Sequence, residues 1–371
     1  MWFSVQKFGV TGAPRIGPRT DSHRGVASDT VTDLASAPQS TSEQGPTPEQ
    51  GPFESDPILV EVVRNGTIES VHHGRVAVTA PDGRLIRSLG AALAPMYPRS
   101  SSKPMQAVGL VRAGLDLPPD LLALVCASHS GEPFHVDAVR RILEHAGLGE
   151  SDLQTPPDWP ADEQATHDLI RAGGEKSAIT MNCSGKHAGM LATAALNGWP
   201  TAIYRDPDHP VQLAILQTID DLAGEQAGLL AVDGCGAPLY AVSLYGLARS
   251  FGRIAGATEG PEARVAEAIR SHPQNVSGTR RDELALHRAI PGLVGKAGAE
   301  AVYAVGLADG TGVAIKISDG SPRARAAAMA ATLQRLGLSA PTLDEQVATP
   351  VLGHGDRVGE IRPVAGAFAR L

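Results

Sequence analysis

The order of strand-like and helix-like segments is the feature that most restricts how this chain of 371 residues folds. β-Branched segments lie toward both ends of the sequence, and the middle carries apolar residues at helical spacing. A regular alternation of strands and helices would predict a parallel α/β fold, and this chain has no such alternation. We therefore expect an α+β fold, in which one antiparallel sheet formed from both chain ends packs against a helical lobe.

Five segments are predicted as strands because they alternate between apolar and polar residues or are rich in β-branched ones. Sequences typical of tight turns, Asn65-Gly66, Pro81-Asp82-Gly83 and Asp309-Gly310, follow or separate them. The predicted strands are 58–63, 73–79, 84–88, 301–307 and 313–317.

The predicted helices have apolar residues three and four positions apart, and 105–115 reads as an amphipathic one. The segment 121–127 is continuously apolar, so we expect it to be buried in whichever element it forms. The predicted helices cover 105–115, 136–147, 162–172, 183–197, 211–222, 240–251, 262–271 and 323–336.

The first 57 residues are rich in Ser, Thr, Pro, Gly and Gln and cannot bury enough apolar surface to offset the entropy of ordering. We expect a disordered tail over 1–57 and one catalytic domain over 58–371. The net charge of −8, without a Lys or Arg cluster, argues against a nucleic-acid partner. No apolar run is long enough to span a bilayer, and residues 1–10 do not resemble a secretory signal. Three cysteines are too few for a disulfide framework, so we expect a cytoplasmic protein.

Ser100 and Lys103 lie three residues apart at the start of the predicted helix 105–115, so their side chains would share a face. A serine hydroxyl needs an adjacent base to become a nucleophile, and a desolvated lysine can be that base. The helix N-terminus would stabilise a developing oxyanion. The Ser-x-x-Lys pattern is short, however, and the alternative is an ordinary helix start with a solvated lysine.

Two other segments could contribute to the same site. Ser128 follows the buried run 121–127, where polar groups tend to line a cleft, although 128–131 taken alone more often indicates a polar turn that caps the next helix. Lys296 lies beside a predicted strand and would place a cation at the sheet edge, unless it is a surface lysine.

Cys183 and Cys235 lie among Gly and Ser in segments expected to be exposed loops, unlike Cys126 within an apolar run. Exposed thiols are a liability in a cell, so two of them suggest a use. A zinc site would take His187 or, less usually, Lys186 as a third ligand. A cysteine nucleophile, or loops that merely contain cysteine, are the alternatives.

Taken in order, these segments resemble those of the Rhizobium-type (class 3) L-asparaginases, also called the asparaginase II family. The chain is similar more distantly to serine β-lactamases, penicillin-binding proteins and serine-dependent glutaminases. The likeness covers roughly residues 58–320, and its matching segments are 99–104, 126–132, 182–187, 232–236 and 296–300.

The resemblance implies a β-lactamase-like fold and the hydrolysis of L-asparagine to L-aspartate and ammonia. It implies a first Ser–Lys pair at Ser100 and Lys103, and a second serine at Ser128. Lys296 matches the second lysine, with Lys316 as a weaker alternative. Two facing lysines would lower each other's pKa, which keeps one neutral enough to act as a base.

The resemblance also implies a homodimer and a Zn²⁺ site beside the substrate. Its metal ligands would be Cys183, Lys186 and Cys235, and its neighbours Arg99, His187 and Asp233 would bind the substrate. The sequence leaves open which serine is acylated. It also leaves open a glutaminase or a β-lactam-interacting hydrolase on the same fold, and a non-catalytic, metal-stabilised binding protein.

Overall fold

The computed structural model describes residues 56–371, so the tail predicted over 1–57 lies outside the described residues except at its last two positions. Asp56 is already buried. Its carboxylate accepts hydrogen bonds from Arg75 Nε at 3.1 Å and from Ser318 Oγ at 2.7 Å. Among the described residues, contacts with the sheet are thus already present two residues before the expected boundary at Ile58.

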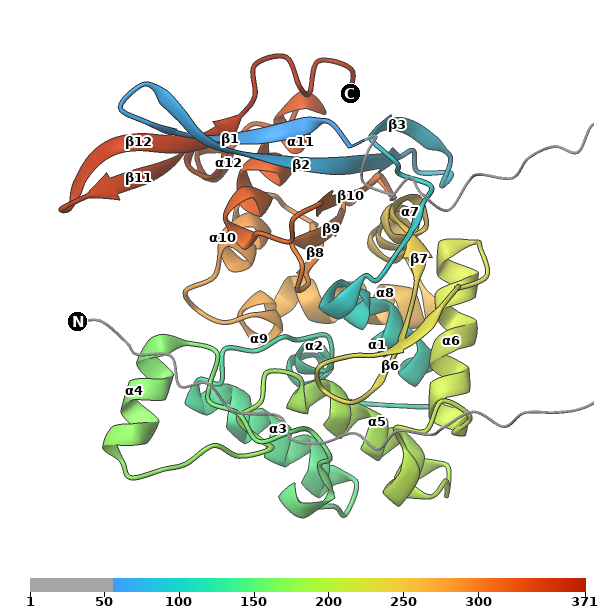
Figure 1. Cartoon of the computed structure of the whole chain (residues 1–371). Helices are drawn as coiled ribbons and strands as arrows, with labels where there is room; N and C mark the ends of the chain where they lie inside the picture. The colour runs from blue at the N-terminus through green and yellow to red at the C-terminus, as the bar shows by residue number, and fades with distance from the viewer. Residues whose placement is uncertain (1–55) are drawn as a thin grey trace, which may run out of the picture. The chain divides into compact units, whose positions relative to one another are not determined.

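One antiparallel sheet takes its strands from both ends of the described chain, as the blue and red strands of Figure 1 show. The strand order is β11-β12-β1-β2-β10-β9-β8, and β3 pairs with the second half of β2. This topology confirms the predicted sheet and all five predicted strands, whereas β8, β11 and β12 were not predicted. The strands are β1 (Ile58–Arg64), β2 (Thr67–Thr79), β3 (Leu85–Leu89), β8 (Val294–Ala297), β9 (Val302–Gly306), β10 (Gly312–Ile317), β11 (Thr349–Gly353) and β12 (Asp356–Pro363).

Helices cover both faces of this sheet. On one face, α7 (Leu244–Gly256) packs against β2, β9 and β10, where the strands present small residues. A Cβ atom on Gly312 would lie 1.9 Å from the Ala248 carbonyl oxygen, so this close packing requires glycine. On the other face, α11 (Arg325–Arg335) and α12 (Pro341–Val347) cover larger aliphatic side chains of the same strands.

Apart from α10 (Asp282–Ala289), which packs against α12 and β8, the remaining helices form the predicted helical lobe together with α7, below the sheet in Figure 1. Among the described residues, no helix combines the length and the apolar character that crossing a bilayer requires. The helices are α1 (Lys103–Arg112), α2 (Pro119–Val125), α3 (Pro133–His145), α4 (Glu163–Arg171), α5 (Ser184–Leu196), α6 (Pro210–Ala223), α8 (Gly260–Ser271), α9 (Pro273–Val276) and α10 (Asp282–Ala289). Short elements connect them: β4 (Pro95–Met96), β5 (Leu230–Val232), β6 (Pro238–Tyr240), β7 (Val242–Ser243), and the 3₁₀ turns η1 (Arg99–Ser102), η2 (Glu150–Asp152), η3 (Thr201–Ile203) and η4 (Pro322–Ala324).

Helix α1 differs from its prediction in two ways. The serines lie in η1, a separate 3₁₀ turn, and α1 itself begins at Lys103. The helix is not amphipathic, because every residue from Lys103 to Val111 is buried between α5, α6 and α8. Lys103 is therefore an interior lysine, and the alternative of a solvated lysine is wrong.

Candidate active site

A cleft of about 220 Å³ holds three of the four predicted catalytic residues, Ser100, Ser128 and Lys296. These residues come from η1, from the loop after α2, and from the edge strand β8. The fold thus brings together side chains almost two hundred positions apart. The other lining residues are Asn182, Arg281, Glu283, Ala297, Gly298, Ala299 and Arg325.

The backbone around Ser100 is unusual. Arg99 has a φ of 51°, in the left-handed region that side chains rarely adopt. A Cβ atom on Gly298 would lie 3.2 Å from Ser100 N and 2.9 Å from Ser101 N, so the end of β8 lies directly against these amides. N–H groups at the start of a helix favour negative charge. The turn therefore presents Ser100 at a position suited to an oxyanion.

Lys103 contacts Ser128, and the expected hydrogen bond to Ser100 is absent. Its Nζ donates to Ala127 O at 2.5 Å, to Cys183 Sγ at 3.0 Å and to Ser128 Oγ at 3.1 Å. These three bonds use every proton of an ammonium group. The long side chain reaches past η1 to the end of α2, where the acceptors are. Across residues 56–371, the Ser100 hydroxyl has no hydrogen-bond partner.

Lys296 is buried beneath the cleft and donates to Glu283 Oε1 at 3.0 Å and to Ala297 O at 2.6 Å. Burial lowers its pKa to about 8, and the charge of Lys103 acts in the same direction, against the opposing effect of Glu283. Lys103 thus lowers the pKa of Lys296, which is one half of the predicted mutual effect. Lys316 donates to Glu300 O and Ile317 O and does not line the cleft.

Glu283 is a site residue that the sequence did not reveal. Its Oε1 atom accepts from both Lys296 Nζ and the Ala297 amide, at 3.0 and 2.9 Å. Burial would raise its pKa, but Lys296 and Arg325 together lower it to about 2, so the carboxylate is ionised. Helix α10, which carries Glu283, was not predicted, and an isolated glutamate in such a segment gives no signal of its own.

The expectation that Cys183 and Cys235 lie in exposed loops is wrong. Cys183 caps α5, Cys235 lies in the β5–β6 turn, and both are buried, with 3% and 1% exposure. Their hydrogen bond lowers the pKa of Cys235, as does Lys186, whose Nζ lies 3.1 Å from the Cys235 sulfur. The same bond, together with burial, raises the pKa of Cys183. One sulfur is thus a thiolate and the other a thiol.

His187 lies beside Cys183, Lys186 and Cys235, and we call these four residues the sulfur cluster. His187 does not line the cleft. Its Nδ1 atom lies 2.7 Å from the Tyr204 hydroxyl, and burial lowers its pKa to about 4, so the ring is neutral. Its Nε2 atom is buried beside Cys235 and forms no hydrogen bond of ordinary geometry with any described residue.

The predicted neighbours Arg99 and Asp233 contact each other, with Arg99 Nε 2.7 Å from Asp233 Oδ1. Arg99 also lies 3.8 Å from Glu300 Oε1. Because Arg99 precedes Ser100 and Asp233 lies two residues before Cys235, this ion pair connects the cleft to the sulfur cluster.

The side chains of the sulfur cluster suit a soft divalent metal ion such as Zn²⁺. Within residues 56–371, no group of three His, Cys, Asp or Glu side chains has a metal-binding arrangement. Two sulfurs, one already ionised, nevertheless converge with a lysine amine and an uncommitted imidazole nitrogen. Thiolate and neutral imidazole are ligands that zinc accepts. Lys186 would have to lose a proton to join them.

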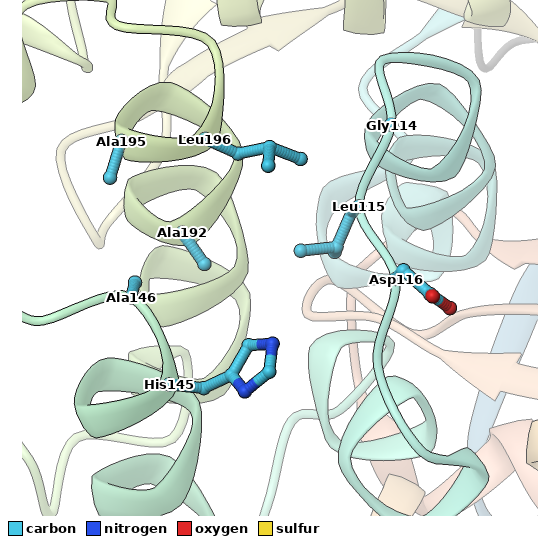
Figure 2. A pocket seen from close by; sticks show the side chains of 8 residues that line it. All are labelled: Gly114, Leu115, Asp116, His145, Ala146, Ala192, Ala195 and Leu196. Carbon is cyan, nitrogen blue, oxygen red and sulfur yellow. The ribbon is translucent and has the colours of Figure 1, made fainter.

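A second hollow, of about 270 Å³, lies between the end of α1 and the helices α3 and α5 (Figure 2). Leu115 and Leu196 point into it, and His145 lies at its edge. Most of its lining is aliphatic, and none of the predicted site residues contributes to it. The chemistry is therefore assigned to the Ser100 cleft.

The comparisons with solved structures give weak likenesses. Mglu in its native form is 16% identical, with a TM-score of 0.36 over 66% of this chain and 59% of the Mglu chain. Mglu in 4.3 M NaCl is also 16% identical, with a TM-score of 0.40 over 76% and 66%. A beta-lactamase from Mycobacterium bovis is 13% identical, with a TM-score of 0.32 over 67% and 88%. The chain thus spans less than two thirds of Mglu, and likenesses at these TM-scores carry no argument about the site.

Sequence comparison is more informative. No curated protein matches the chain. The model of the family described as L-asparaginase II matches residues 60–363, well beyond residue 320, where the resemblance was expected to end. This match covers most of the sequence and includes every predicted site residue. The chain belongs to the L-asparaginase II family.

Proposed function

We propose that this protein hydrolyses the side-chain amide of L-asparagine and releases L-aspartate and ammonia. The observation that carries the proposal is the cleft, in which two serines lie with a buried lysine whose pKa is lowered to about 8. An amine with such a pKa is partly neutral near physiological pH and can accept a proton. Membership of the L-asparaginase II family supplies the substrate class.

In this mechanism Ser100 is the nucleophile, because its hydroxyl is uncommitted and faces the cleft. Its Oγ attacks the amide carbon, a C–O bond forms, and the proton passes to neutral Lys296. The oxyanion lies toward the Ser100 amide at the start of η1, because the Ser101 amide already donates to Pro98 O at 3.2 Å. Lys103 donates hydrogen bonds to Ala127 O, Cys183 Sγ and Ser128 Oγ, and so keeps Ser128 in place beside the cleft.

The intermediate then collapses with cleavage of the C–N bond. The departing nitrogen takes the proton back from Lys296 and leaves as ammonia. Water attacks the acyl carbon and gives a proton to Lys296, and Ser100 regains that proton as L-aspartate leaves. Each step uses only groups that line the cleft.

We also propose that the sulfur cluster binds Zn²⁺ through Cys183, Lys186 and Cys235. When bound, the metal would supply a fixed positive charge that helps to position the substrate. Arg99 and Asp233 couple this cluster to Ser100 through their ion pair. Complete removal of zinc with no loss of activity would contradict this role.

Ammonia release from L-asparagine, L-glutamine and other small amides tests the activity. We expect turnover of L-asparagine that Ser100→Ala abolishes. Ser102→Ala is a matched control, because Ser102 lies in the same turn and its hydroxyl donates only to the Arg99 carbonyl at 2.9 Å. Rapid-quench mass spectrometry should find the acyl group on Ser100, and an adduct on Ser128 would reverse the two roles.

Other results would favour the alternatives. Preference for L-glutamine would indicate a glutaminase, and labelling by fluorescent penicillin a β-lactam-interacting hydrolase. Zinc binding without turnover would indicate a metal-stabilised binding protein. We further propose a cytoplasmic homodimer, which light scattering and cell fractionation test.

A further inference from the structure

One arginine of the cleft has no carboxylate partner. Arg99 pairs with Asp233, and Arg325 lies 2.6 Å from Asp282. Arg281 also lines the cleft, but no described carboxylate lies within 4 Å of its guanidinium. Its Nε makes a long contact of 3.4 Å to Ser130 Oγ. Most of its donors are therefore available to a ligand.

We propose that Arg281 binds the α-carboxylate of the substrate, and that Ser130 and Glu132 position it. This inference rests on the proposed hydrolysis of an amino-acid amide. A guanidinium binds a carboxylate through two parallel N–H···O bonds, which fixes both distance and orientation. L-Asparagine carries such a carboxylate beside the amide that Ser100 attacks.

The segment before Arg281 is held by a series of hydrogen bonds from the segment that begins with Ser128. The Ser128 amide donates to Val276 O at 3.0 Å, and Ser130 Oγ donates to Ser277 O at 2.9 Å. These two bonds hold the segments side by side. The position of Ser128 and the position of the segment that leads to Arg281 therefore depend on the same hydrogen bonds.

Glu132 completes this support. Its Oε1 accepts from the Thr279 amide at 2.9 Å, and its Oε2 accepts from Thr279 Oγ1 at 2.7 Å. Between them Gly278 has a φ of 142°, and a Cβ atom there would lie 2.1 Å from Ser130 Oγ. This close packing against Ser130 and Glu132 therefore requires glycine at position 278. Ser130 and Glu132, to which the proposed mechanism gives no role, thus have a positioning function.

The electrostatics of the cleft agree with an anionic ligand. Lys296 and Arg325 are each matched by an acidic partner, Glu283 and Asp282 respectively. Arg281 forms no ion pair with a described acid, so its positive charge is available to a negatively charged ligand. Such a charge favours a carboxylate ligand.

The test compares two substrates in matched variants. L-Asparagine has the α-carboxylate, and 3-aminopropanamide has the same amide without it. We expect Arg281→Met to raise KM for L-asparagine about 30- to 100-fold, the loss typical of a hydrogen bond to a charged group, with kcat little changed. The KM for 3-aminopropanamide should change far less between the wild-type protein and Arg281→Met, because this substrate has no carboxylate for Arg281 to bind. Arg281→Lys should recover part of the loss, because a single charge replaces the two-pronged contact.

Arg280→Met is the matched control, because Arg280 is the preceding residue and pairs with Asp162 outside the cleft. It should leave both substrates unaffected. Glu132→Gln should raise KM for L-asparagine more than for 3-aminopropanamide, whereas a merely structural role would affect both equally.

An unchanged KM for L-asparagine in Arg281→Met, or equal losses on both substrates, would overturn the inference and leave the proposed function standing. If the wild-type protein releases no ammonia from L-asparagine, the proposed function fails. Calorimetry with L-aspartate then decides the inference: affinity that falls in Arg281→Met supports a carboxylate site, and equal affinity or no binding overturns it.

Discussion

Two buried lysines in this molecule have opposite acid–base behaviour. Lys296, beneath the cleft, and Lys186, in the sulfur cluster, are each only 1% exposed. Burial opposes the charge on both. The pKa of Lys296 is lowered to about 8, whereas the pKa of Lys186 is raised, because the two cysteines and Asp233 outweigh burial.

The comparison shows that the neighbours of a buried amine, and not burial alone, decide its chemistry. Burial lowers the pKa of Lys296; the carboxylate of Glu283 beside it opposes that shift, and Lys103 nearby adds to it. Lys186 faces an ionised sulfur and stays a cation unless a metal displaces its proton. One lysine can therefore act as a base, and the other belongs to a binding site.

The largest expected effect comes from removing the base. Lys296→Met should lower kcat/KM about 10³- to 10⁴-fold, because no other described group of lowered pKa in the cleft can take the proton from Ser100. Lys316→Met is the control, since Lys316 is also a buried lysine of this sheet but does not line the cleft. Steady-state ammonia release measures both. Equal losses in the two variants would show that Lys296 acts only through stability.

The sulfur cluster should give the next largest effect. Cys235→Ser removes the thiolate beside Lys186, and we expect it to abolish stoichiometric zinc binding and to lower activity about 10- to 100-fold. Cys126→Ala is the matched control, because burial raises the pKa of Cys126 to about 12 and keeps it a thiol. Metal analysis of the purified variants measures the zinc. Full zinc content in Cys235→Ser would refute the ligand assignment.

The pH dependence sharpens the contrast further. Lys296 is active when neutral, so kcat/KM should fall about tenfold for each pH unit below its pKa of about 8 and level off above it. Glu283 raises the pKa of Lys296, so Glu283→Gln should move the midpoint to lower pH. A pH–rate profile of both proteins measures the shift. A midpoint that moves upward, or does not move, would mean that another group titrates.

Much of the fold could be predicted because each segment carries its own signal. The turn sequence Asn65-Gly66, for example, adopts the positive φ values that a tight hairpin requires. The strand β8 carries a glycine in its middle and is only four residues long, so it has no readable periodicity. The C-terminal hairpin of β11 and β12 is partly exposed on both strands, which also weakens the apolar pattern.

The site was predictable where residues are close in sequence, and less so where they meet through the fold. Ser100, Ser128 and Lys296 were identified from three motifs, and the cleft contains all three. The partner of Lys103 was predicted wrongly, because local spacing favoured Ser100 and the side chain reaches Ser128 in another segment. Glu283 in α10 and Arg281 just before it belong to the site because their segment lies against β8 and the Ser128 segment. No local sequence pattern predicts that contact.

The smallest expected effect lies behind the sulfur cluster. The Tyr204 hydroxyl contacts His187 Nδ1 at 2.7 Å and accepts from the Gln154 amide at 3.1 Å. Tyr204→Phe leaves both groups without this partner, so we expect a loss of about 1 kcal/mol in unfolding free energy and a two- to fivefold loss of activity. Urea unfolding and ammonia release measure the two. Because the hydroxyl contacts neither sulfur nor Lys296, zinc content and the pH midpoint should not change. A shift in that midpoint would mean that Tyr204 and His187 couple the surroundings of Lys186 to those of Lys296. The two lysines would then not be independent, as the comparison assumes.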